Sequence, residues 1–542
     1  MPSVRAWWVG SALIAASFAV GCDGTGGSDA GAADGGVDAG ALPPPMVTTS
    51  LGPVVGDRVE GAIDFLGIPF AEPPVGDLRF APPQPAEPWT DPRPSIRPPR
   101  CVQAALGLDL DSQEDCLYLN VHTPDPLPTN APVMVWIHGG AFLFGEGLQT
   151  DDGTRGDRLA AEHGVIVVSM NYRLGALGFL SHPELADALG GASGNFGLMD
   201  QRLAMQWVRD NIAAFGGDPA NITLFGESAG GISVCAHLAA QGSHGLYDRA
   251  ISESGLCDDP YVARTDAQAR GDAYATDLGC TTPGEVVSCL RSKTPEELLA
   301  ADPSQDSVIS AIAAREMFWV SVDGTFLTET FHDAAVGGRV ADVPIVMGWN
   351  GDEGSIFVLL AEQTGEVVDE NTYMTVSQGL ADANGVSVDD VRAAYPIADY
   401  DDVGAAVAAL AGDASLACPS RRAVRLLAEN GREVYAYHFE YPDAAFQIPS
   451  TRPLGAFHSA EVQFVFGHPS AIGQTRFRSE DERQLNTAIS GYWTSFAGGD
   501  LNAGATVTWP RYDAAMDRAL IFDRTIAVGD RPSADRCAVW EP

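Results

Sequence analysis

Residues 221–231 read NITLFGESAGG. The apolar run at 222–225 has the character of a buried strand, and the small residues from 232 to 240 predict a helix. Between them lies Gly-x-Ser-x-Gly, with Ser228 at its centre. A strand, this pattern and a helix together predict a nucleophilic serine on a sharp turn. Glycines flank the serine because so tight a turn leaves no room for Cβ atoms. The alternative is a serine that only caps the helix.

Other apolar runs alternate with helical or loop-rich stretches along the chain. They cover residues 133–137, 165–170, 222–225, 250–253, 345–348, 434–439 and 520–522. This alternation predicts an α/β fold with a mostly parallel central sheet and helices on both faces. Residues 258–340 and 355–430 are richer in Ala, Glu and Asp, and they predict helical cap insertions over the active edge of the sheet. Insertions of this kind usually shape a substrate pocket.

The composition is strongly acidic. Of the 542 residues, 72 are Asp or Glu and 32 are Lys or Arg, which leaves a net charge of −40. Nucleic acid is therefore excluded as a partner, because no basic stripe exists to replace its counterions. The surplus acids are interpreted as a solvated surface that keeps the protein soluble. Lys293 is the only lysine and no Ser-x-x-Lys occurs, so the penicillin-binding type of esterase is also excluded.

The first 22 residues predict an export signal. Arg5 is the only charge ahead of a short apolar run, and small residues directly precede Cys22. This arrangement resembles a bacterial lipobox, in which the cysteine is lipidated and becomes the mature N-terminus. Residues 23–45 then predict a flexible linker. We expect an exported protein that touches a membrane only through this anchor; with ordinary signal cleavage it would be periplasmic or secreted.

A nucleophilic serine also needs donors for the developing oxyanion. The predicted strand at 133–137 runs into HGGAF, a glycine turn at residues 138–142. Loops of this type supply backbone N–H groups in esterases. We expect Gly140 and Ala141, together with Ala229 after the serine, to form the oxyanion hole. The alternative is an ordinary tight turn.

The remaining groups are an acid and a histidine, expected in that order after the serine. Asp352 and Glu353 directly follow a predicted strand, and the pattern alone cannot choose between them. Three histidines come later. His438 lies inside a predicted strand, which favours a packed structural role, and His468 precedes a proline in a loop. His458, in a glycine-led loop that opens a predicted helix, is favoured as the base.

Several longer motifs resemble the type-B carboxylesterase/cholinesterase family. They are GIPFAEPPVGDLRF (67–80), EDCLYLNV (114–121), NYRLGALGFLS (171–181), GNFGLMDQRLAMQWVRDNIAAFGGDP (194–219) and FGESAGG (225–231). The resemblance extends over about residues 50–540 and implies an α/β-hydrolase fold for a domain at 46–542. It also implies the catalytic residues: Ser228, with Glu353 in N-x-D-E-G as the acid and His458 in H-x-x-E as the base.

The nine cysteines are typical of an oxidising compartment. With Cys22 lipidated, eight remain, and sequence alone allows 105 pairings among them. The resemblance implies three disulfides, namely Cys101–Cys116, Cys280–Cys289 and Cys418–Cys537. Cys235 and Cys257 either pair or stay as buried thiols.

The resemblance further matches Glu227 and Ser254 to buried polar positions behind the catalytic residues, where a supporting role and a purely structural role are both open. It matches Arg79 and Glu114 to a structural ion pair.

Three departures bear on the substrate. The loop between Cys101 and Cys116 contains no aromatic residue, and Ile356 stands where cholinesterases place an aromatic. Such rings bind the choline cation. Ala141 replaces a third glycine in the oxyanion loop, which should not matter because only its N–H is used.

We therefore expect a serine carboxylic-ester hydrolase that forms an acyl-enzyme with small or medium neutral esters. No metal or organic cofactor is implied, and the oligomeric state stays open. One alternative is a lipase acting on longer chains. Another is a non-catalytic binding module, although such modules lose the serine or its partners, which this chain retains.

Overall fold

The computed structural model describes residues 43–541 apart from 106–107, 110–111, 149–152, 192, 259–260, 303–317, 446–449, 451 and 471–475. The expected signal peptide, Cys22 and all but the end of the expected linker lie outside these residues. Contacts divide the chain into Met1–Pro43 and Pro44–Pro542. The second unit contains every element discussed below.

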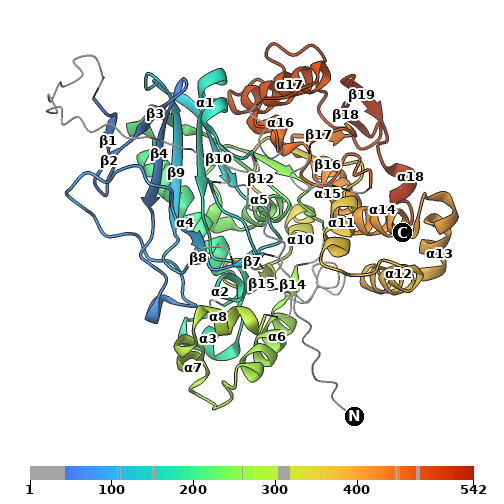
Figure 1. Cartoon of the computed structure of the whole chain (residues 1–542), viewed down its shortest axis with the longest axis horizontal. Helices are drawn as coiled ribbons and strands as arrows, with labels where there is room; N and C mark the ends of the chain where they lie inside the picture. The colour runs from blue at the N-terminus through green and yellow to red at the C-terminus, as the bar shows by residue number, and fades with distance from the viewer. Residues whose placement is uncertain are drawn as a thin grey trace, which may run out of the picture. The chain divides into compact units, whose positions relative to one another are not determined.

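The core of this unit is a sheet with eleven strands in the described part of the chain. Their spatial order is β19 (Ala527–Asp530), β18 (Arg518–Phe522), β17 (Val434–Phe439), β16 (Ile345–Asn350), β13 (Arg249–Glu253), β12 (Gly217–Glu227), β10 (Ala131–Ile137), β11 (Ile166–Met170), β9 (Tyr118–Pro124), β4 (Ala62–Pro69) and β3 (Asp57–Val59). Figure 1 shows the blue N-terminal strands at one edge and the red C-terminal strands at the other.

The seven strands from β18 to β11 pair in parallel. They are the seven predicted runs, so the predicted α/β class and parallel sheet are confirmed. Four outer strands pair antiparallel and were not predicted; they are β9, β4 and β3 at one side of the sheet and β19 at the other. β9 escaped prediction because it buries three polar residues, Asn120, His122 and Thr123, and so lacks an apolar pattern.

Alternate side chains of β10 pack into two separate hydrophobic cores, one on each face of the sheet. Val133, Val135 and Ile137 of β10 join the core beneath α4 (Phe196–Asn211), α5 (Ala229–Ala239), α10 (Phe331–Val336) and α15 (Cys418–Glu429). Met134 and Trp136 join the core beneath α1 (Asp157–His163), α16 (Val462–Phe466) and α17 (Glu480–Ala497). Successive side chains of a strand point to opposite faces, so helices cover both faces of the sheet, as predicted.

The two insertions are largely helical. The first contains α6 (Arg264–Asp277), α7 (Val286–Ser292), α8 (Pro295–Ala300) and α10, with the short strands β14 (Val262–Ala263) and β15 (Ser321–Val322). The second contains α11 (Ser355–Gln363), α12 (Glu370–Asn384), α13 (Val388–Ala394), α14 (Val403–Gly412) and α15. Between α14 and α15 the π-helical segment Asp413–Ala417 makes one continuous helix, Val403–Glu429. Among the described residues it alone has the length and hydropathy of a membrane span, but 72% of its apolar window is buried in the protein, as in a core helix.

The other α-helices and β-strands of the described residues are short. They are α2 (Gly175–Phe179), α3 (Pro183–Ala188), α18 (Ala534–Cys537), β1 (Met46–Thr48), β2 (Pro53–Val55), β5 (Arg100–Cys101), β6 (Ala104–Ala105), β7 (Leu108–Asp109) and β8 (Ser112–Gln113). The expected functional residues other than His458 follow the carboxyl ends of β10, β12, β13 and β16, which meet at one edge because these strands are parallel. His458 lies between β17 and α16.

Candidate active site

Ser228 lies on the turn between β12 and α5, as predicted. Its φ of 56° and ψ of −121° are strained for a residue with a Cβ atom. Its N–H donates to the carbonyl of Glu253 at 2.9 Å, which fixes the turn against β13. A Cβ atom at Gly226 would lie 2.7 Å from the backbone of Gly230, and one at Gly230 only 2.0 Å from the carbonyl of Ile137. Both glycines of the motif are therefore needed for close packing.

The glycine turn after β10 lies against this serine. A Cβ atom at Gly139 would be 3.2 Å from the Cβ of Ser228. Gly140 and Ala141 adopt φ values of 102° and 55°, in the region that favours glycine. Among the described residues, nothing accepts a hydrogen bond from the N–H groups of Gly140, Ala141 or Ala229. These donors are thus available to a ligand beside Ser228.

The turn that follows β16 brings Glu353 to His458. Oε2 of Glu353 lies 2.7 Å from Nδ1 of His458, and both side chains are buried. Oε1 of Glu353 accepts hydrogen bonds from Ser254 Oγ at 2.7 Å and from the N–H of Asn350 at 2.8 Å. A carboxylate held by three partners keeps the imidazole ring of His458 in one orientation, as an orienting acid must.

The residues left open by the pattern have other partners. Asp352 bonds to the backbone of Ala456 and not to a histidine. Nδ1 of His438 lies 2.9 Å from Glu440, and Nε2 of His468 lies 2.8 Å from Asp157. Of the candidate acids and histidines, the structure brings together only Glu353 and His458.

Glu227 flanks the other side of the His458 ring. Its Oε1 lies 3.1 Å from Nε2 of His458 and accepts a hydrogen bond from Ser459 Oγ. Burial disfavours a charged imidazole, but the carboxylates of Glu227 and Glu353 outweigh it and raise the pKa of His458 to about 9. No described contact joins Ser228 Oγ to His458; catalytic hydrogen bonds often tighten only when substrate binds.

Two further buried carboxyls near this site were not predicted. Glu461 binds Asn350 Nδ2 through Oε2 at 2.5 Å, and burial raises its pKa to about 8, helped by Glu227 and Glu353. Glu253 accepts from Trp493 Nε1 at 3.0 Å, and burial raises its pKa well above the usual range. Glu461 could have been found from the sequence, because it is the Glu of the H-x-x-E motif. Glu253 could not, because a strand pattern does not show which polar residues are buried.

No metal is expected from the sequence. Within the part of the chain that the structure describes, no group of three His, Cys, Asp or Glu side chains could hold one.

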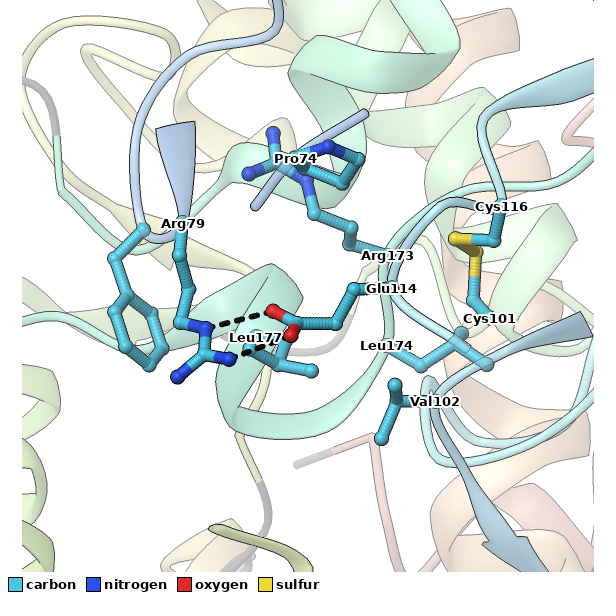
Figure 2. A pocket seen from close by; sticks show the side chains of 10 residues that line it. Pro74, Arg79, Cys101, Val102, Glu114, Cys116, Arg173, Leu174 and Leu177 are labelled. Carbon is cyan, nitrogen blue, oxygen red and sulfur yellow. Dashed lines mark hydrogen bonds and ion pairs between the residues drawn. A yellow bond between two sulfur atoms is a disulfide. The ribbon is translucent and has the colours of Figure 1, made fainter. Parts of the chain in front are cut away.

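The expected structural ion pair is also present. The Arg79 guanidinium binds Glu114 through two hydrogen bonds of 2.6 and 2.5 Å. Figure 2 shows the pair near the Cys101–Cys116 disulfide. The structure also pairs Cys280 with Cys289 and Cys418 with Cys537. Disulfides of this number are typical of proteins that are exported from the cytoplasm.

Comparisons with known proteins identify the family. The profile of the carboxylesterase family matches residues 43–540. The chain belongs to the carboxylesterase family. It is 36% identical to a cholinesterase of Mus musculus, over 91% of this chain and 86% of that protein. It is 34% identical to an acetylcholinesterase of Bungarus fasciatus, over 88% and 82%.

Solved esterase structures share the fold of this carboxylesterase. A PNB esterase superposes with a TM-score of 0.76 at 31% identity, and a thermophilic PNB esterase with 0.78 at 32%. Each match covers 91% of this chain and 99% of the other. The predicted family, the α/β-hydrolase fold and the activity are confirmed: the protein is a serine hydrolase of carboxylic esters.

Proposed function

We propose that Ser228, His458 and Glu353 form the catalytic triad of this carboxylesterase. The observation that carries the proposal is the bond of 2.7 Å between Glu353 and His458 beside the strained turn of Ser228. Ser228 Oγ attacks the ester carbonyl while Nε2 of His458 takes its proton. His458 then gives that proton to the leaving alcohol, and the acyl group stays on Ser228. Water, deprotonated by His458, releases the acid and restores the serine.

The N–H groups of Gly140, Ala141 and Ala229 would stabilise the oxyanion of both tetrahedral intermediates. Their support is that they lie beside Ser228 without an acceptor among the described residues. Loss of one such donor typically costs about 10²–10³ in kcat. Ala141 serves as well as glycine, because only its N–H takes part and its φ of 55° is already adopted.

The substrates would be small or medium neutral esters. The loop between Cys101 and Cys116 has no aromatic ring, and Ile356 is buried in the core that also contains Met134 and Trp136. An acylcholine would therefore lack the ring faces that bind its cation. The sequence identity with two cholinesterases does not favour acylcholines as substrates, because these two positions lack the rings that would bind the cation.

A comparison of purified wild type with Ser228→Ala tests this function. On p-nitrophenyl esters of graded chain length, we expect the best kcat/KM for short and medium chains, with a loss of about 10⁶ in kcat for the variant. Circular dichroism of the variant should match wild type, because Ser228 is only half-buried and its side chain does not cap α5. A variant with a tenth of wild-type turnover would exclude Ser228 as nucleophile, and a preference for long chains would indicate a lipase.

We also propose that Cys22 anchors the exported enzyme to the cell envelope, with residues 23–45 as a tether and 46–542 as one catalytic domain. The support is the lipobox-like sequence before Cys22. In a bacterial host, Cys22→Ser should move the enzyme from the membrane fraction or block its processing. An unmodified mature N-terminus at another residue, found by mass spectrometry, would disprove the anchor.

A further inference from the structure

A fourth disulfide joins the helix after the nucleophile to the loop after β13. Cys235 lies in α5 and Cys257 in the loop that follows Glu253; their Cα atoms are 5.5 Å apart, and both residues are buried. A separation of this size is usual for a disulfide. The sequence had left these two cysteines either paired or free.

The loop that this disulfide holds has an unusual backbone. Ser254 and Leu256 adopt φ values of 49° and 45°, which side chains rarely tolerate. Between them, a Cβ atom at Gly255 would lie 2.0 Å from Ser252 Oγ and 2.7 Å from the backbone of Gly231 in α5. Such conformations persist only where the surroundings impose them, so this loop needs to be held against α5.

The same loop supports the acid of the site. Ser254 Oγ donates to Oε1 of Glu353 at 2.7 Å, and the N–H of Ser254 donates to the carbonyl of Gly348 at 2.9 Å. Glu353 in turn holds Nδ1 of His458. A displacement of Ser254 would thus move the Glu353 carboxylate and, through it, His458.

We propose that the Cys235–Cys257 disulfide is a positioning element of the active site, which holds Ser254 where it orients Glu353. The disulfide spans from one turn beyond the packed glycines of α5 to a point three residues after Ser254. The loop is thus tied to α5 through Cys257 and to β16 through the hydrogen bond from the N–H of Ser254 to Gly348. This inference rests on the proposed triad.

The first test is whether the bond exists in the exported protein. Digestion without reduction, followed by mass spectrometry, should yield one linked peptide pair that contains residues 235 and 257. Alkylation of both cysteines without prior reduction would overturn the proposal.

The second test removes the bond and compares it with a matched loss elsewhere. Cys235→Ala/Cys257→Ala should lower kcat about tenfold with KM changed less than twofold, because orientation of the catalytic groups is lost while the pocket is kept. The control is Cys280→Ala/Cys289→Ala, which removes a disulfide of the first insertion and should leave kcat unchanged. Activities are measured well below each unfolding midpoint and are referred to the folded fraction.

A double-mutant cycle with Ser254→Ala separates positioning from stability. If the disulfide acts through Ser254, removing it in the Ser254→Ala background should change kcat less than twofold. Additive losses, or equal losses in the control, would overturn the inference. Failure of the proposed triad would instead appear as activity retained by Ser228→Ala, so the two failures are distinguishable.

Discussion

Asp352 and Ala456 are joined by two hydrogen bonds. The N–H of Asp352 donates to the carbonyl of Ala456 at 2.9 Å, and the N–H of Ala456 donates to Oδ2 of Asp352 at the same distance. Asp352 immediately precedes Glu353, and Ala456 lies two residues before His458. These bonds therefore hold the turn that carries the acid against the loop that carries the histidine.

Asp352→Ala should lower kcat about ten- to a hundredfold, since small displacements of catalytic groups have effects of this size. KM should change little, because Asp352 holds backbone and not substrate. Steady-state kinetics on a short p-nitrophenyl ester measure both constants. Asp352→Asn is the matched control: its amide oxygen still accepts from Ala456, so it should retain most of kcat. Equal losses in both variants would show that the negative charge matters and not the hydrogen bond.

The pH dependence of kcat/KM should reveal the effect of the Glu227 carboxylate on the pKa of His458. The histidine must be neutral to accept the proton of Ser228, so kcat/KM rises with pH as His458, with its raised pKa of about 9, loses its proton. Glu227→Gln removes a charge that favours the protonated ring. The rising limb of the profile should then move to lower pH by about one unit or more.

The control for this profile is Glu440→Gln, which removes a carboxylate beside His438, a histidine outside the site. Its profile should coincide with that of wild type. A limb that stays in place in Glu227→Gln would mean that Glu227 does not act on the catalytic histidine.

Asp157 should stabilise the fold in a pH-dependent way. Burial opposes its charge, but His468 and Arg155 outweigh burial and lower its pKa to about 2. A carboxyl whose pKa is lower when folded contributes stability above its unfolded pKa and loses it as pH falls through the folded value. At pH 7 this lowering of the Asp157 pKa contributes about 2 kcal/mol to the free energy of unfolding.

Asp157→Asn should therefore lower the free energy of unfolding in urea by about that amount at pH 7. The difference from wild type should shrink as the pH is lowered from 5 towards 3. The exposed Asp389 provides a control, and Asp389→Asn should change little. If wild type and Asp157→Asn differ in free energy of unfolding by the same amount at every pH, the ion pairs of Asp157 do not contribute to stability.

Neutral esters should be better substrates than acylcholines. Each missing cation–π contact is worth about 0.5–2 kcal/mol, so two losses predict about tenfold or more poorer kcat/KM for acetylcholine than for an isosteric neutral ester. The acidic surface attracts cations, but salt screens this attraction, so the comparison belongs at physiological ionic strength. Equal turnover there would point to another aromatic residue, and Phe357, whose ring is 5.3 Å from that of His458, is the first to test.

The sequence by itself determined the parallel sheet and the position of the predicted nucleophile. Both are local properties: each of the seven runs is apolar enough to be a buried strand, and strand, Gly-x-Ser-x-Gly and helix follow one another around Ser228. The choice of Glu353 over Asp352 came from a resemblance, because the pattern could not separate these adjacent residues. The pattern favoured His458 over two other histidines, and the resemblance settled it.

Only the tertiary structure decided how the parts of the site meet. Asp352 and Glu353 are adjacent in sequence, yet one binds the backbone of Ala456 and the other binds His458, 105 residues away. Which way each side chain points depends on the turn after β16 and on the distant loop packed against it. The same holds for Ser254 and for Cys235 with Cys257, whose partners were set by the packing of β13 against α5 and β16. Local patterns specify strands and helices, whereas contacts between distant loops arise only when those elements pack.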